Sequence, residues 1–240
     1  MNIKIRKEEK MRQRFIPNEA FRKFKIRDTK KQFMILKKYF DTFRSFELSF
    51  QTQDKALPID SESYFVGADF ALLSDCYEEA VKMVFETISE NRPFKNKLSN
   101  QMSAKHLRPG SMCNGILDII CEDQNDNHVI VYPAQLGTIL YGLTPGKARR
   151  LSEQRNRFGL STFLVSLIIL THPDILISKD EMGICCIGDD YSPNGDYNFD
   201  SSPVFYLDND GKTLVFDYIN RGTNWNNTIG CATGLFIPTN

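Results

Sequence analysis

Acidic side chains in the segment DYSPNGDYNFDS, residues 190–201, have the spacing of a calcium-binding loop. Asp190 stands at the first position, and the third, fifth and sixth positions also match, as Ser, Asn and Gly. The twelfth position is Ser201, where a calcium loop needs a bidentate glutamate. The pattern therefore favours a solvated loop between two strands. The alternative is a weak cation site, with the candidate ligands Asp189, Asp190, Asp196 and Asp200.

A second near match is the segment GTILYGLT, residues 137–144, which has the outer spacing of a phosphate-binding loop. Leu143 stands where the lysine that contacts the phosphates belongs, and apolar side chains fill positions 139–141. The segment follows Pro133 and is predicted to be helical. These departures argue against nucleotide phosphate as the ligand, and we expect no cofactor.

Cysteine and histidine offer one candidate for nucleophilic chemistry. Cys113 lies near His106 and two basic residues in a segment predicted to be a long irregular loop, residues 91–115, where a thiol could have a lowered pKa. The vicinal pair Cys185 and Cys186 lies in an apolar strand, so its side chains point to opposite faces and are predicted to be packed thiols. The histidines, at positions 106, 128 and 172, lack the spacing of a metal site.

The most apolar stretch of the chain is a helix candidate. Residues 158–171 carry no charge but are too few to span a bilayer as a helix. Ser161 is placed to cap the first helical turn, and Pro173 ends the helix at His172. A helix that is apolar on every side is predicted to lie inside its own domain. The sequence thus predicts a buried central helix.

The net charge of zero conceals a strong asymmetry. Residues 1–40 contain 14 Lys or Arg and four Asp or Glu, whereas the other 200 residues contain 16 and 26. Such a basic arm can bind phosphate backbones or the protein's own acidic body. The candidate contacts with an anionic partner are Arg22, Lys23 and Lys25.

Part of this arm has a helical period. From Thr29 onward, apolar side chains recur at spacings of three and four, which predicts one amphipathic helix with its lysines outside. The aromatic members of the stripe are therefore expected to pack in a core rather than stack on bases. The stripe consists of Phe33, Leu36, Phe40, Phe43 and Glu47.

The remaining elements predict an α+β fold with N-terminal helices, a mainly antiparallel C-terminal sheet and the buried central helix. A basic helical arm, 1–50, precedes a single domain, 51–240, with a loop at 52–64. A helix capped by Ser74 follows, and another starts at Thr144-Pro145. Strands are predicted at 116–121, 128–132, 183–188 and near 229–237, with a hairpin at 203–218 that turns at Asp210-Gly211.

The C-terminal half contains a set of short motifs, namely Thr144-Pro145, Arg157, Leu160, His172-Pro173, Pro203 and Gly230-x-Ala232-Thr233. In these positions it resembles a bacterial family that is catalogued as a domain of unknown function. Two departures are Ser161, where Thr is usual, and the lack of an acidic residue within the apolar helix. The resemblance covers about the last 110 residues and implies a fold, without an activity.

These observations favour a non-enzymatic module that binds a protein partner. Trp225, the single tryptophan, lies among polar residues in a predicted loop, a setting typical of interface anchors. One alternative is a hydrolase or transferase with a site near residues 91–115, which would need His106, Cys113, Asp118 or His172 to converge. The other is nucleic-acid association through residues 1–40. The six cysteines form no C-x-x-C pair and no apolar signal segment is present, so we expect a cytoplasmic protein with reduced thiols.

Overall fold

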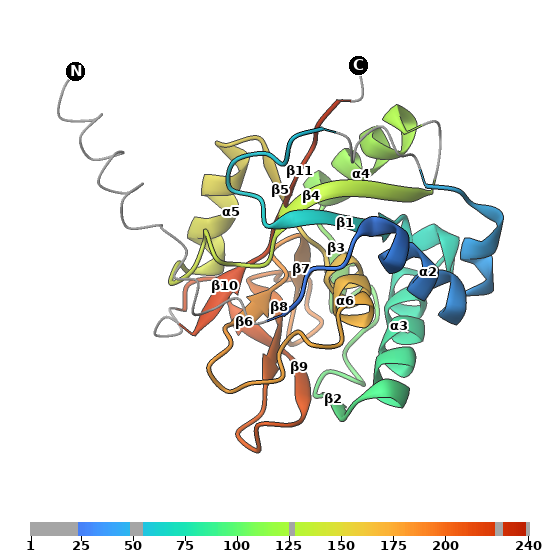
Figure 1. Cartoon of the computed structure of the whole chain (residues 1–240). Helices are drawn as coiled ribbons and strands as arrows, with labels where there is room; N and C mark the ends of the chain where they lie inside the picture. Colours follow the sequence, from blue (N-terminus) through green and yellow to red (C-terminus); the bar gives the residue numbers. More distant parts are fainter. Residues whose placement is uncertain (1–23, 49–54, 125–127, 224–227, 239–240) are drawn as a thin grey trace, which may run out of the picture.

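An α+β architecture of two sheets and five α-helices forms the described part of the chain (Figure 1). The prediction of the fold class is therefore confirmed. The helices and strands alternate along the chain, which differs from the expected succession of N-terminal helices and C-terminal strands. The computed structural model describes residues 24–48, 55–124, 128–223 and 228–238.

The first sheet has four antiparallel strands in the order β1-β4-β11-β5. Strand β1 pairs along its whole length with β4, and Ser63 lies opposite Ala134. The short strand β11 is inserted between β4 and β5, although it comes much later in the chain. The strands are β1 (Ser63–Ala68), β4 (Val129–Gln135), β5 (Arg157–Gly159) and β11 (Thr233–Leu235).

The second sheet has seven strands and is mixed. The pairs β10–β6 and β2–β9 are parallel and the other four pairs are antiparallel, so the expected mainly antiparallel sheet is confirmed in part. The predicted hairpin is β8–β9, with Gly211 at a positive φ of 72° in its turn. The strands are β2 (Phe94–Asn96), β3 (Leu107–Pro109), β6 (Gly183–Cys185), β7 (Asp189–Tyr191), β8 (Ser201–Leu207), β9 (Leu214–Asn220) and β10 (Ile229–Cys231).

Four of the five described α-helices were predicted from caps or apolar periods, α4 being the exception. The Thr144 side chain accepts a hydrogen bond from the Lys147 amide at the start of α5, as expected. Helix α3 instead begins after Cys76, and Ser74 hydrogen-bonds the Cys76 amide, so the predicted Ser74 cap is wrong. The helices are α2 (Thr29–Tyr39), α3 (Tyr77–Asn91), α4 (Ser111–Asp123), α5 (Pro145–Glu153) and α6 (Thr162–Thr171), with 3-10 turns η2 (Asp41–Ser45) and η3 (Phe70–Leu72).

Helix α6 is the centre of the core, as the sequence predicts. All ten of its residues are buried, and it contacts α3, α2 and β1. Figure 1 shows it in the middle of the molecule, below β1 and beside α3. The Ser161 side chain accepts from the Leu164 amide, which confirms the predicted cap. Within the described ranges, every helix is too short or too polar to cross a bilayer.

Residues 116–121, predicted to be a strand, belong to helix α4, and that prediction is wrong. Cys113, Leu117 and Ile120 are the buried residues of α4. Their spacing of four and three is that of one helical face, whereas the apolar run alone fits either element. Packing of this face against the core therefore favours the helix over the strand.

The helix predicted after Pro133 is also absent from the structure. Strand β4 continues to Gln135. The side-chain oxygen of Gln135 accepts hydrogen bonds from the amides of Gly137 and Ile139. Gly137 has a φ of +114° and lies so close to Gly230 that a side chain would collide with that backbone. Residues 136–144 therefore form bends without helix or phosphate-loop geometry.

The amphipathic stripe at the start of the chain divides between two elements. Helix α2 ends at Tyr39, and Phe40 adopts an extended conformation before η2 begins, so a single helix that reaches Glu47 is wrong. Phe33, Leu36, Phe40 and Phe43 are nevertheless buried in the same core as α6, and Glu47 is exposed. The aromatic side chains pack in the core, as expected.

Candidate functional site

The first amides of α6 are satisfied by side chains from distant segments. The Thr162 amide donates to Asp189 Oδ2 over 2.7 Å. The Tyr77 hydroxyl donates to both Asp189 oxygens over 2.9 and 2.8 Å, and accepts from the Phe163 amide over 3.3 Å. A carboxylate at this position also complements the positive end of the helix dipole. Asp189 and Tyr77 thus complete the cap that Ser161 begins.

Asp189 is a buried side chain, whereas residues 194–200 of the following loop are mostly exposed, as expected for a solvated loop between two strands. The exposed fraction of Asp189 is zero, and burial raises the pKa of its carboxyl to about 7, against the lowering effect of its hydrogen bonds. Burial likewise raises the pKa of the Tyr77 hydroxyl. The carboxyl therefore changes its charge near neutral pH, inside the protein.

The next residue, Asp190, points toward three arginines. Arg149 contacts its Oδ1 atom over 2.8 Å and also donates to the Asp189 carbonyl over 2.7 Å. Arg221 contacts the same Oδ1 atom. Arg108 lies opposite Asp190 in the β3–β7 pair, and its guanidinium is 3.5 Å from Asp190 Oδ2. Burial acts to raise the pKa of Asp190, but the hydrogen bonds from Arg149 and Arg221 outweigh it and the pKa is lowered. Asp190 thus stays ionised and holds the arginines in place.

The following loop, residues 192–200, is held by His106. The His106 carbonyl accepts from the Ser192 amide over 2.7 Å, and the imidazole Nδ1 lies 2.9 Å from the Ser192 carbonyl. Gly195 has a φ of +65° and packs on the His106 ring, where any side chain would collide. Asp196 accepts from the Ser192 hydroxyl over 2.8 Å. The buried His106 side chain therefore has a supporting role for this loop.

Tyr197 stands at the tip of this loop. Its φ of +64° is uncommon for a bulky residue, and its side chain is 69% exposed. The rings of Tyr197 and Phe199 lie 6.4 Å apart, and the Arg108 guanidinium stacks 3.7 Å from the centre of the Phe199 ring. We define the arginine–tyrosine face as the connected set Arg108, Arg149, Asp190, Tyr197, Phe199 and Arg221.

The candidate cation ligands are divided among separate contacts. Asp189 and Asp190 are engaged as described, and Asp200 accepts from Ser201 and Asn220. Among the residues that the structure describes, no group of three or more His, Cys, Asp or Glu side chains has an arrangement suited to a metal ion. Three other candidate binding residues, Arg22, Lys23 and Trp225, lie outside the described residues.

The thiol candidates lie in the interior. Cys113 is buried in α4. Burial raises the pKa of its thiol, and the negative charge of Asp189 raises it further, so the predicted lowering of this pKa is wrong. Cys185 and Cys186 are both buried and belong to two different clusters of the core, as expected for neighbours in a strand. Neither position has the positively charged, accessible setting of a reactive thiolate.

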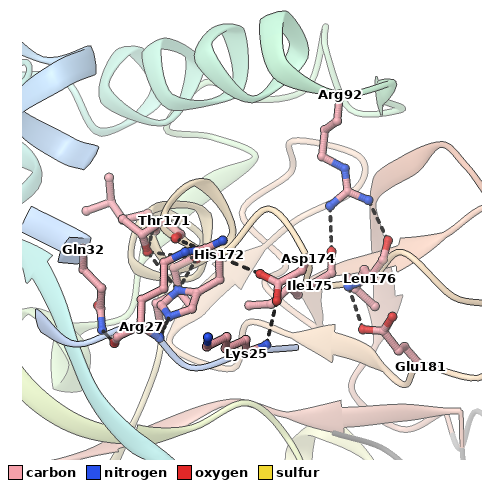
Figure 2. A network of polar contacts seen from close by, with 12 residues as sticks. Lys25, Arg27, Gln32, Arg92, Thr171, His172, Asp174, Ile175, Leu176 and Glu181 are labelled. Carbon is pink, nitrogen blue, oxygen red and sulfur yellow. Dashed lines mark hydrogen bonds and ion pairs between the residues drawn. The ribbon is translucent and has the colours of Figure 1, made fainter. Parts of the chain in front are cut away.

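The other end of α6 is covered by the described start of the chain (Figure 2). Arg27 donates to the Thr171 carbonyl over 2.6 Å and pairs with Asp174, while its amide lies 3.2 Å from His172 Nε2. Burial lowers the pKa of His172 to about 4. Lys25 is exposed, and its amide donates to Asp174 over 2.6 Å. The basic arm therefore supplies a cation to the negative end of the core helix.

The loop after α6 is fixed by two further charged residues. Arg92 donates to the carbonyls of Ile175 and Leu176, both over 2.6 Å, and Glu181 accepts from the Leu176 amide (Figure 2). Glu181 also accepts from the next two amides, at positions 177 and 178. A pocket beside this loop has a volume of about 20 Å³, the space of roughly one water molecule. Its carboxylates are Glu62, which accepts from Thr138, and the already satisfied Glu181. It lacks the size of a substrate site.

No family model, curated protein or solved structure matches this chain. The resemblance of the C-terminal half to a domain of unknown function stays a prediction.

The arginine–tyrosine face joins residues that the sequence keeps far apart. The sequence pointed to Asp190 through its calcium-like spacing but gave no signal that Arg108, Arg149 and Arg221 surround it. The only local sign of the loop conformation is the Asn-Gly pair at 194–195, which is typical of a turn. The partners of Asp189 could not be found from spacing, because Tyr77 is 112 residues away.

Proposed function

We propose that this protein is a non-enzymatic binding module and that the arginine–tyrosine face contacts a protein partner. Tyrosine and arginine provide a large share of the binding energy in protein interfaces. The face joins both residue types to a rigid part of the second sheet. Its pre-organised loop also lowers the entropy that is lost on binding.

The observation that carries this proposal is the conformation of Tyr197. An exposed aromatic residue in left-handed backbone costs folding free energy, on the order of 1 kcal/mol or more. The loop is nevertheless fixed from below by His106, Gly195 and the Asp196–Ser192 hydrogen bond. A strained conformation with such support is typical of a functional position. Contact with a partner gives the exposed ring a role.

The enzymatic alternative near residues 91–115 receives less support from the geometry. Strands β2 and β3 and the start of α4 occupy much of this segment. Cys113 is buried, Asp118 is exposed on α4, and His106 is engaged with Ser192. His172 lies at the end of α6 opposite to Asp189, about 15 Å away along a helix of ten residues. These four side chains do not converge.

A photo-crosslinking experiment tests the proposed interface. Replacing Tyr197 with benzoylphenylalanine places a reactive group on the face, and the same replacement of Met34, which is 70% exposed on α2, is the matched control. After irradiation in a lysate of the source cells, we expect one discrete adduct at position 197 and none at position 34. The captured protein is then identified by mass spectrometry and purified.

Rebinding of the purified partner decides the result. We expect Tyr197→Ala and Arg108→Ala each to weaken binding at least about tenfold, as for interface anchors. Met34→Ala should leave the dissociation constant unchanged. Equal binding by all three variants, or equal crosslinking at both positions, would refute the proposed interface.

A further inference from the structure

The arginine–tyrosine face carries more positive charge than its own carboxylate can balance. Three guanidinium groups surround Asp190. Arg149 and Arg221 share one oxygen of that carboxylate, so their charges lie close together. Burial and then the charge of Arg149 lower the pKa of Arg221, and the charges of Asp190 and Asp200 offset this only in part. An added anion would relieve this repulsion.

The arginines also keep donor groups for such an anion. Each guanidinium has five N–H donors, and the contacts described for Arg149 use only its two terminal nitrogens. Arg221 Nε has no hydrogen-bond partner among the described residues but is buried, so it can reach an incoming anion only if the side chain moves. The Arg108 side chain is 51% exposed and is oriented by its stacking on Phe199. Planar guanidinium groups held in this way match carboxylates in a bidentate geometry.

We infer that the partner binds through an acidic segment, whose glutamate or aspartate carboxylates contact Arg108, Arg149 and Arg221 beside Tyr197. This inference rests on the proposed binding function and specifies the chemistry of the partner. Asp190 acts as the internal carboxylate that arranges the three arginines for the incoming one. The neighbouring aromatic rings exclude water from the new ion pairs, which strengthens them.

A residue-specific titration tests the inference on the full chain. The basic residues before position 41 can also attract acidic peptides, so the readout must report the face itself. We would follow the side-chain Nε resonances of the three arginines by NMR during addition of a capped tetraglutamate peptide. A capped tetraglutamine peptide is the uncharged control, and a thymidine oligonucleotide of the same length tests for nucleic acid.

The expected result is a saturable shift of the Arg149 and Arg221 resonances with tetraglutamate, weakened as salt increases. Arg108→Gln should reduce the affinity severalfold, and Lys95→Gln, an exposed change on β2, should not. Absence of shifts, equal shifts with tetraglutamine, or stronger shifts with the oligonucleotide would each overturn the inference. Because this titration needs no partner, its failure is separate from failure of the crosslinking at position 197.

Discussion

At the scale of single residues, buried Asp189 is the most informative. Its neighbour Asp190 is ionised among arginines, while Asp189 has a raised pKa of about 7 in the interior. Beyond the effect of burial, the charge of Asp190 raises the pKa of Asp189 further, whereas hydrogen bonds from Thr162 and from the neutral Tyr77 hydroxyl lower it. Beyond their own burial, the charge of Asp189 in turn raises the pKa of Cys113 and Cys186. Two adjacent carboxylates therefore have opposite shifts, because one has lost water without a cation and the other has gained two cations.

Replacing Asp189 with asparagine should change how stability depends on pH. The folded pKa of about 7 exceeds the usual value of 3.8, so the folded state binds the proton more tightly than the unfolded state does. This contribution to stability is complete below about pH 4 and is lost as the pH rises through 7. Between pH 5 and pH 8, wild type should lose about 3 kcal/mol relative to Asp189→Asn. Urea unfolding of both proteins at the two pH values measures the difference.

His172 makes this comparison of two proteins necessary. Its folded pKa of about 4 lies below the usual 6.5, so its contribution to stability is lost as the pH falls from 6.5 through 4. The two groups thus have opposite slopes in the acidic range. Because His172 is present in both proteins, its contribution cancels in the difference. A difference that stays constant between pH 5 and pH 8 would contradict the raised pKa of Asp189.

At the scale of secondary-structure elements, α6 shows what a sequence can and cannot predict. Its length, its Ser161 cap and its stop at His172 were predicted, because they depend on neighbouring residues. The other contacts at the two ends of α6 were not predictable, because they come from three separate segments of the chain. Tyr77 and Asp189 contact its start, and Arg27 contacts its end. The same limit explains α4, where a short apolar run fits a strand or a helix until its packing partners are known.

Removing the Tyr77 hydroxyl should destabilise the protein through α6. Tyr77→Phe leaves the Phe163 amide without its acceptor and takes the donor from both Asp189 oxygens. The expected loss in the free energy of unfolding is about 2 kcal/mol or more, since all these groups are buried. Tyr39→Phe is the matched control, because that hydroxyl contacts Asn91 on the exposed surface. Equal urea midpoints for the two variants would show that the Tyr77 hydroxyl does not support the helix.

At the scale of the whole molecule, the basic start of the chain is partly joined to the core. Arg27 contacts the end of α6, and Phe33 and Leu36 of α2 are buried in the main cluster. A truncation that begins at residue 41 would remove these contacts and open the core. The predicted binding of nucleic acid through residues 1–40 is therefore tested with a variant that begins at residue 24.

The test compares full-length protein with this variant by fluorescence polarisation of labelled single-stranded RNA and double-stranded DNA. If the arm binds phosphate backbones, the affinity should fall steeply with salt and be lost in the variant that begins at residue 24. Urea unfolding of both proteins checks that the shortened variant is still folded. Equal binding by the two proteins would place the contact in the body, and lack of binding at low salt would remove nucleic acid as a ligand.

The position of β11 has a consequence for how the chain folds. This strand, at residues 233–235, pairs with β4 on one side and β5 on the other, so the first sheet stays divided until it arrives. Strands β1 and β4 can pair during synthesis, but β5 joins them only through a segment made about 75 residues later. Since closing such long loops is slow, we expect the first sheet to be completed late in folding, after β11 has been synthesised. Until then the edges of β4 and β5 are open to other strands, and chaperones that shield such edges would then raise the yield of native protein.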